Sequence, residues 1–393
     1  MRGKAAILAV LGTSWALLAG GCGAAEPPLE PRSSGASSWR AVPAGPLSAR
    51  EGALGLWTGR EVVLVGGSDA PPCPPNAACV PPDVPPLADG AAFDPESGTW
   101  RRIAPSPVPF EWAQGIVVGA TGYVWIPGSP GRPKAEAAFL AYRIEDDRWD
   151  TLPLPSGGLG WYHGIVQVGN RIVLYSSSDE ESEQPDLLFD PRSATWSELP
   201  PDPLSPSFDR SMAWGGRELI LFDHELVPNP GSEEPAVTRA AALDLDAGSW
   251  RRLPDSEILA TGPWVLADAR LLNPVLGGAD GGSNAWGRRY PFGGILDPAS
   301  GRWSDLPEPP TGEDDFGSGV LTSSGGHYFG YRGWILDATS DTWIELPALG
   351  GDEHVTGRTV VNAGADLLVF GGANWASGAS EGALLDDAWS WSP

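Results

Sequence analysis

Three arginines in this 393-residue sequence could bind a charged ligand. Arg50, Arg210 and Arg358 each stand near the start of a segment that we expect to form the first strand of a structural repeat. Guanidinium groups bind carboxylates and phosphates through paired N–H donors, so three of them around one opening would form an anion site. The same side chains could instead form ion pairs with neighbouring acidic residues. Both interpretations remain open from the sequence.

Four tryptophans that lie outside the repeated tryptophan motif described below are further candidates: Trp112, Trp161, Trp286 and Trp375. They lie near expected strand starts or in loops between strands. Aromatic rings in such places can stack on sugars or hold a partner protein, and packing within the loop is the alternative. Together with the three arginines, these tryptophans are the candidate ligand-binding residues.

No combination of residues typical of a catalytic site stands out. The histidines are scattered, and no HExxH pattern or other metal-binding spacing joins them: His163, His224, His327 and His354. Acidic clusters at residues 179–181 and 313–315 could hold calcium or form solvated loops. We therefore predict no catalytic residue, no metal and no cofactor, and we favour a non-enzymatic role.

The first 22 residues have the features of an export signal. Arg2 and Lys4 precede an apolar stretch, Ala5 to Leu18, which is too short and too poorly flanked for an ordinary spanning helix. The following residues, Leu-Ala-Gly-Gly-Cys22, resemble the lipobox of bacterial lipoproteins, although Ala19 stands where leucine is commonest in that family. The resemblance implies a signal peptide at residues 1–21 and lipidation of Cys22. An ordinary signal peptide cleaved after small residues is the alternative.

The residues after Cys22 predict a tether and a location. Residues 22–37 show no apolar periodicity and are typical of a flexible segment. Gly23 is not the aspartate that signals inner-membrane retention in well-studied lipoproteins, so the resemblance implies anchoring at the outer membrane, on its periplasmic or surface face.

Two further cysteines, Cys73 and Cys79, lie in the proline-rich stretch PPCPPNAACVPP. In an exported, oxidising setting two close cysteines in a stiff loop are expected to pair. Free thiols and a metal site are the alternatives, but two thiols without a nearby histidine make a poor zinc site. We predict a Cys73–Cys79 disulfide.

The formal net charge of −25 limits the partners. Such a field repels phosphate backbones and anionic membrane surfaces, so we predict no nucleic acid partner and membrane attachment only through the N-terminal lipid.

A repeated motif predicts the fold. The pattern W-x-x-[VIL]-[PA] begins at Trp39, Trp100, Trp149, Trp196, Trp250, Trp303 and Trp343, which are separated on average by about 51 residues (304 residues over six intervals). In five repeats an aspartate stands six residues before the tryptophan, as Asp94 does before Trp100, and turn-forming residues lie between them. Together with short β-branched segments, this favours repeated four-stranded antiparallel meanders.

Diglycines at residues 66–67, 277–278 and 371–372 complete a resemblance to the kelch repeat family, which covers residues 38–393. This resemblance implies an all-β fold, a β-propeller. The chain begins with an isolated fourth-strand motif at Trp39 and ends with a third strand around Trp389. We therefore predict that the N-terminal strand completes the last blade and closes a ring of seven blades.

The predicted function is a monomeric platform at the cell envelope that binds an unidentified envelope protein or glycan through its loops. The alternative is a periplasmic carbohydrate-active enzyme of the epimerase or sialidase kind, with its active site at the mouth of the propeller channel. Fold alone does not decide between them.

Overall fold

The computed structural model divides the chain into two units, Met1–Ala36 and Ser37–Pro393. It describes residues 38–74, 77, 79, 84–128, 137–155, 162–180, 185–228, 235–259, 261–273, 291, 293–307, 310, 328–331, 334–347, 349, 355–364, 366–375 and 382–392. The predicted signal peptide, the lipidation site at Cys22 and the tether lie outside these ranges. All of the described secondary structure is β, as predicted, so none of the described elements is a helix that could cross a membrane.

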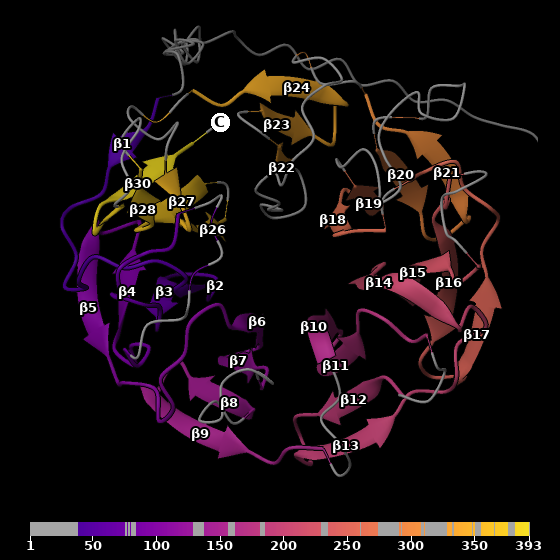
Figure 1. The fold of residues 1–393 in the computed structure, drawn as a ribbon, viewed down its shortest axis with the longest axis horizontal. Helices are drawn as coiled ribbons and strands as arrows, with labels where there is room; N and C mark the ends of the chain where they lie inside the picture. The colour runs from indigo at the N-terminus through magenta and orange to yellow at the C-terminus, as the bar shows by residue number, and fades with distance from the viewer. Residues whose placement is uncertain are drawn as a thin grey trace, which may run out of the picture. The chain divides into compact units, whose positions relative to one another are not determined.

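Five antiparallel sheets of four strands each follow one another along the chain (Figure 1). Sheet 1 contains β2 (Leu54–Trp57), β3 (Val62–Val65), β4 (Gly90–Asp94) and β5 (Thr99–Ile103). Sheet 2 contains β6 (Gln114–Val118), β7 (Thr121–Ile126), β8 (Ala138–Arg143) and β9 (Arg148–Leu152). Sheet 3 contains β10 (Tyr162–Val168), β11 (Arg171–Ser176), β12 (Leu187–Asp190) and β13 (Thr195–Glu198). Sheet 4 contains β14 (Ser207–Trp214), β15 (Leu219–Glu225), β16 (Arg239–Asp244) and β17 (Ser249–Arg252). Sheet 5 contains β18 (Val265–Ala267), β19 (Arg270–Asn273), β20 (Gly294–Asp297) and β21 (Arg302–Asp305).

The remaining strands form three more sheets. Sheet 6 has three described strands: β22 (Tyr328–Tyr331), β23 (Trp334–Asp337) and β24 (Thr342–Glu345). Sheet 7 has the order β1 (Arg40–Ala41), β30 (Ala388–Trp391), β27 (Asp366–Phe370) and β26 (Thr359–Ala363). A small sheet contains β25 (Val355–Thr356), β28 (Ala373–Asn374) and β29 (Ala383–Leu384). As predicted, the N-terminal strand β1 pairs with the C-terminal strand β30, with Arg40 opposite Ser390, and the two lie side by side in Figure 1.

The repeated aspartates form the turns between the third and fourth strands. Asp94 Oδ1 accepts the amide N–H groups of Glu96 and Ser97 at 2.8 and 3.2 Å. Gly98 then takes a positive φ of 68° and donates its N–H to the Asp94 carbonyl at 2.8 Å. Asp190, Asp244, Asp297 and Asp337 accept backbone amides in the same way. The turn chemistry predicted from the sequence is therefore confirmed.

The repeated tryptophans link neighbouring sheets through one hydrogen bond each, donated by the indole Nε1. The acceptor is always the carbonyl at the last position of the preceding motif. The pairs are Trp100–Pro43, Trp149–Ala104, Trp196–Pro153, Trp250–Pro200, Trp303–Pro254 and Trp343–Pro307, at 2.7–2.8 Å. Trp39 donates to the Pro347 carbonyl at 2.6 Å, which joins the first motif to the last.

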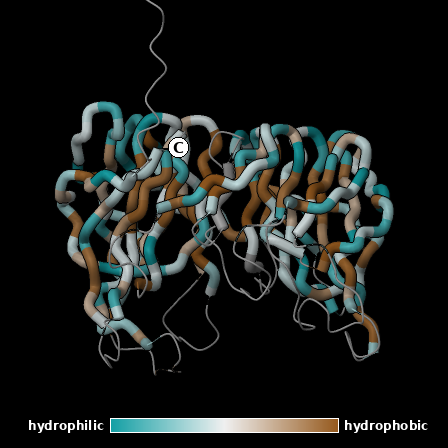
Figure 2. The backbone as a smooth tube through the Cα atoms, turned by 90° about the horizontal axis from the view of Figure 1, so that it is seen from above, coloured by the Kyte–Doolittle hydropathy of each residue, from teal (hydrophilic) through white to brown (hydrophobic). Residues whose placement is uncertain are grey.

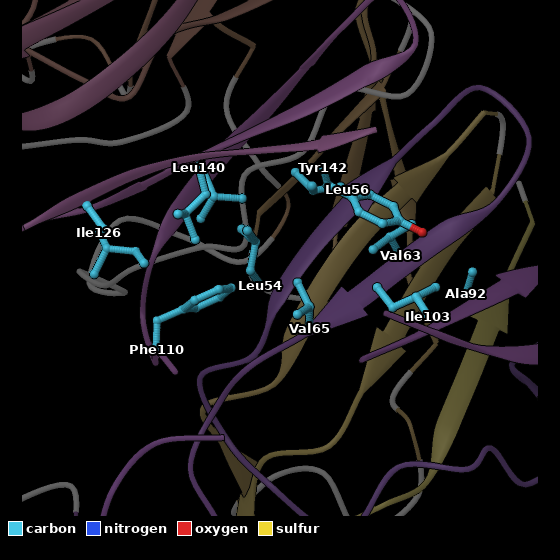
Figure 3. Packing of buried hydrophobic residues seen from close by; sticks show 12 residues of the cluster. Leu54, Leu56, Val63, Val65, Ala92, Ile103, Phe110, Ile126, Leu140 and Tyr142 are labelled. Atoms are coloured by element: carbon cyan, nitrogen blue, oxygen red, sulfur yellow. The ribbon is translucent and has the colours of Figure 1, made fainter. Parts of the chain in front are cut away.

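The core consists of apolar clusters that bridge neighbouring sheets. In the cluster of Figure 3, Leu54 and Val65 of sheet 1 pack with Ile126 and Leu140 of sheet 2. Corresponding clusters bridge sheets 2 and 3, 3 and 4, 4 and 5, 5 and 6, and 6 and 7. Another joins sheet 7 back to sheet 1. Figure 2 shows the same pattern as hydrophobic strand segments between hydrophilic turns. The arrangement is compatible with a β-propeller.

Candidate binding surface at Trp112

Arg50 is buried in a set of hydrogen bonds within sheet 1. Its Nη1 donates to Asp89 Oδ1 at 2.7 Å and to the Gly66 carbonyl at 3.1 Å, and the side chain has no exposed surface. Chiefly because of this hydrogen bond from Arg50, and against the effect of burial, the pKa of Asp89 is lowered. Gly66 follows the second strand of the sheet, and Asp89 precedes the third.

Arg358 and Arg210 make equivalent contacts. Arg358 Nη1 donates to the Gly371 carbonyl at 2.9 Å and to Asp387 at 3.0 Å. Arg210 belongs to sheet 4 but reaches sheet 3, where it bonds to the Ser176 carbonyl and to Asp186 at 3.0 and 2.8 Å. In each case the acceptors are a carbonyl at the end of a second strand and the aspartate before the third strand. These are the contacts of structural ion pairs, and ligand binding by the three arginines stays a prediction.

The predicted tryptophan sites have different surroundings. Trp161 and Trp286 lie outside the described residues. Trp375 is buried, and its Nε1 donates to Thr356 Oγ1 at 2.9 Å. Trp112 is exposed, with 59% of its surface accessible. Of the two described candidates, Trp112 is therefore the one whose ring is open to a partner.

Backbone hydrogen bonds between three sheets hold Trp112 in place. Its N–H donates to the Gly52 carbonyl at 2.9 Å, and the Gly52 N–H donates to the Gly357 carbonyl at 3.3 Å. All three residues have a positive φ, namely 54° at Trp112, 65° at Gly52 and 69° at Gly357. A left-handed conformation is natural for glycine but strained for a bulky residue. Strain of this kind is concentrated at functional sites.

The indole ring of Trp112 lies on the backbone of Gly52. A Cβ added at Gly52 would lie 2.7 Å from the ring, so the ring leaves no room for a side chain there. One face of the indole therefore rests on a glycine surface, which accounts for the position of an otherwise exposed side chain.

The Glu51 carboxylate and the Trp112 ring both approach Gly357. A Cβ placed at Gly357 would be 2.8 Å from Glu51 Oε2 and 3.3 Å from Trp112 Cη2, so both groups meet over this glycine. The backbone of Glu51 is fixed by two hydrogen bonds with Ser68, at 3.1 and 2.9 Å. Burial, followed by repulsion from Glu111, raises the pKa of Glu51. We define Glu51, Gly52, Glu111, Trp112 and Gly357 as the Trp112 surface.

The Trp112 surface combines an open aromatic face with carboxylates at its rim. An indole face packs against the C–H groups of a sugar or against an apolar side chain, and carboxylates accept hydrogen bonds from hydroxyl and amine groups. Trp112 was predicted as a candidate from the sequence, whereas Glu51 and Glu111 were not. Their sequence positions could have indicated them, because Glu51 directly follows the candidate Arg50 and Glu111 directly precedes the candidate Trp112.

The predicted disulfide is present between Cys73 and Cys79, whose Cα atoms are 5.9 Å apart. It closes a loop that follows the second strand of sheet 1. Pro72, next to this loop, lies close to Gly382, where an added Cβ would be 2.9 Å from the proline ring. Among the residues that the structure describes, no group of three or more His, Cys, Asp or Glu side chains is arranged to hold a metal ion.

No family model matches the sequence, and no curated protein matches it either.

Proposed function

We propose that residues 38–393 form a closed seven-bladed propeller of the kelch kind. Two observations support a closed ring of seven. The indole hydrogen bonds continue from each motif to the preceding one, and the bond from Trp39 to Pro347 returns from the first to the last. The apolar clusters pass from sheet to sheet and also join sheet 7 to sheet 1.

We infer that this propeller is an exported, monomeric binding platform, attached to the outer membrane by a lipid on Cys22. Its partner is a protein or glycan of the cell envelope. The observation that carries the binding role is the exposed Trp112, held in a strained conformation above Gly52 and near the Glu51 carboxylate at Gly357. A large open ring on a rigid backbone is the kind of residue that dominates binding energy at interfaces.

Crosslinking and pull-down of the tagged full-length protein from its native envelope tests this role. We expect a stoichiometric partner, and we expect Trp112→Ala to reduce its recovery by about 30-fold or more, the effect of losing a binding hot spot. Val227→Ala is the matched control, because Val227 is also an exposed apolar residue. Equal recovery with wild type and Trp112→Ala would exclude the Trp112 surface as the binding site.

A carbohydrate-active enzyme is the second candidate, and the presence of two carboxyl groups, Glu51 and Glu111, near the exposed Trp112 ring favours it. Glycoside hydrolysis uses two carboxyl groups, one of which is protonated in the resting enzyme. The two candidates differ in turnover. New reducing ends from an envelope glycan that disappear with Glu51→Gln would support the enzyme, whereas binding without any product would support the platform.

The lipid anchor is tested with Cys22→Ser. We expect the wild-type protein in the detergent-soluble membrane fraction, and we expect the variant to leave that fraction or to keep its signal peptide. Membrane association of a processed Cys22→Ser protein would contradict lipid anchoring.

A further inference from the structure

A pocket of about 400 Å³ lies where sheets 3 and 4 meet, and turns between strands form much of its lining. It shares no residue with the Trp112 surface. The β10–β11 turn supplies Gly169, Asn170 and Arg171, the β12–β13 turn supplies Asp190 and Arg192, and the end of β14 supplies Trp214. This volume is within the range of sites that hold small molecules.

Two guanidinium groups at this pocket are weakly engaged. Arg192 is exposed, and within the described ranges its side chain has no hydrogen bond or ion pair; only its backbone N–H is bonded, to Asp190 Oδ1 at 2.8 Å. Arg171 has an ion pair of 3.8 Å with Asp246, whose side chain is fully exposed. Exposed pairs of this kind contribute little free energy. Both arginines are therefore available to a ligand, in contrast to the buried Arg50 and Arg210.

The other groups at the pocket favour one kind of anion. Two arginines are balanced by two carboxylates, Asp190 at the pocket and Asp246 beside Arg171, so the local formal charge is zero before a ligand binds. A ligand with one carboxylate therefore adds less uncompensated negative charge than a dianion such as phosphate. The half-buried indole of Trp214 offers an apolar surface to a ring. Asn170 and Asp190 can hydrogen-bond to hydroxyl groups.

We propose that this pocket binds a small ring compound with one carboxylate, which Arg171 and Arg192 pair with while the ring packs on Trp214. The site is separate from the platform role of the Trp112 surface, and it does not depend on that role.

Isothermal titration calorimetry of the folded protein with three probes at matched ionic strength tests the proposal. D-glucuronate and D-glucose share a ring and differ at one position, a carboxylate against a hydroxymethyl group, and inorganic phosphate is the dianion. We expect saturable binding of glucuronate that is at least about tenfold tighter than that of glucose or phosphate, as charge-assisted hydrogen bonds predict.

Arg192→Gln is the informative variant, because its side chain is exposed and has no partner among the residues that the structure describes, so the change should not disturb the fold. We expect it to weaken glucuronate binding by about tenfold or more. Arg60→Gln is the matched control, since Arg60 is an exposed arginine at the turn between β2 and β3 of sheet 1. The proposal is overturned if glucose or phosphate binds as tightly as glucuronate, if glucuronate does not bind, or if Arg192→Gln binds it like the wild type.

Discussion

At the scale of single residues, the same arginine–aspartate contact serves three places in the fold. A guanidinium group joins the end of a second strand to the start of the third strand at Arg50, Arg210 and Arg358. The loop between these strands is long in sheets 1 and 7, and the contact fixes both of its ends. Arginine suits this role because its planar group bonds to a carbonyl and a carboxylate at once.

Replacing the arginine in the most buried of these contacts should cause a large loss of stability. In the pair of Arg210 with Asp186, the side chains are 1% and 6% exposed, and Asp202 is a second partner of Arg210 at 3.0 Å. Arg210→Gln would leave two carboxylates without their cation, so we expect the free energy of unfolding to fall by about 3–5 kcal/mol. Urea denaturation measures it, with Arg60→Gln as the exposed control, and equal loss in both variants would contradict a structural role.

The contact at Arg50 predicts a dependence on pH. Asp89 faces Arg50 and, at 4.0 Å, Arg102, and its folded pKa is lowered. Because the carboxyl group has a lower pKa in the folded than in the unfolded protein, its ionised form stabilises the fold. This stabilisation is fully present above the unfolded pKa of about 3.9 and is lost as the pH falls through the folded pKa. We expect Asp89→Asn to be less stable than the wild type at pH 7, because the variant loses the ion pair with Arg50. The difference should be only about 1 kcal/mol, because Asp89 is partly exposed and its charge is screened by solvent. The difference should begin to shrink near pH 4 and close once the pH is below the lowered folded pKa of Asp89. A difference that stays constant down to acid would argue against the ion pair.

At the scale of elements, the turn at Asp94–Gly98 allows a test of backbone conformation alone. Gly98 has a φ of 68°, and a Cβ added there would meet no atom within 4 Å. Gly98→Ala should therefore cost about 1 kcal/mol through strain only, and Gly98→Asn less, since asparagine tolerates this conformation. Thermal unfolding of the two variants checks the order. A larger cost for asparagine than for alanine would show that side-chain volume matters at this turn.

The elements are also the level at which the sequence was most informative. The turn aspartates, the fourth-strand tryptophans and the pairing of the N-terminal strand with the last sheet depend on local chemistry or on a repeated spacing, and each could be predicted. The Trp112 surface could be predicted only in part, because residues 52, 112 and 357, which precede the first strands of sheets 1, 2 and 7, meet through backbone hydrogen bonds. The pocket at Arg171 and Arg192 was missed for the same reason: two turns of one sheet and a strand end of the next create it.

At the scale of the whole molecule, the tryptophan motif explains how neighbouring sheets are held in register. A single residue type both packs between sheets and donates one hydrogen bond to the previous repeat, so each sheet is tied to the one before it. In most of these hydrogen bonds the donor and the acceptor belong to adjacent repeats and are about one repeat length apart in the sequence. The exception is Trp39, whose acceptor is 308 residues away.

The contact of Trp39 predicts that strand β1 stabilises the whole arrangement of sheets. Removing residues 23–37 should leave stability unchanged, since the sequence of that segment predicts a flexible tether. Removing residues 23–43 should expose the edge of β30. The second truncation loses the bond to Pro347 and the packing of Trp39 beside Ile335 and Trp391. We expect a loss of about 3 kcal/mol and a tendency to self-associate.

Thermal unfolding and size-exclusion chromatography of the two truncated proteins measure this difference. Trp39→Phe separates the hydrogen bond from the packing, because phenylalanine keeps an aromatic ring and lacks the N–H donor, and it should cost about 1 kcal/mol. Trp250→Phe is the matched control, since its bond to Pro200 is between adjacent repeats. If the protein without residues 23–43 is as stable and as monomeric as the one without residues 23–37, the N-terminal strand does not close the ring.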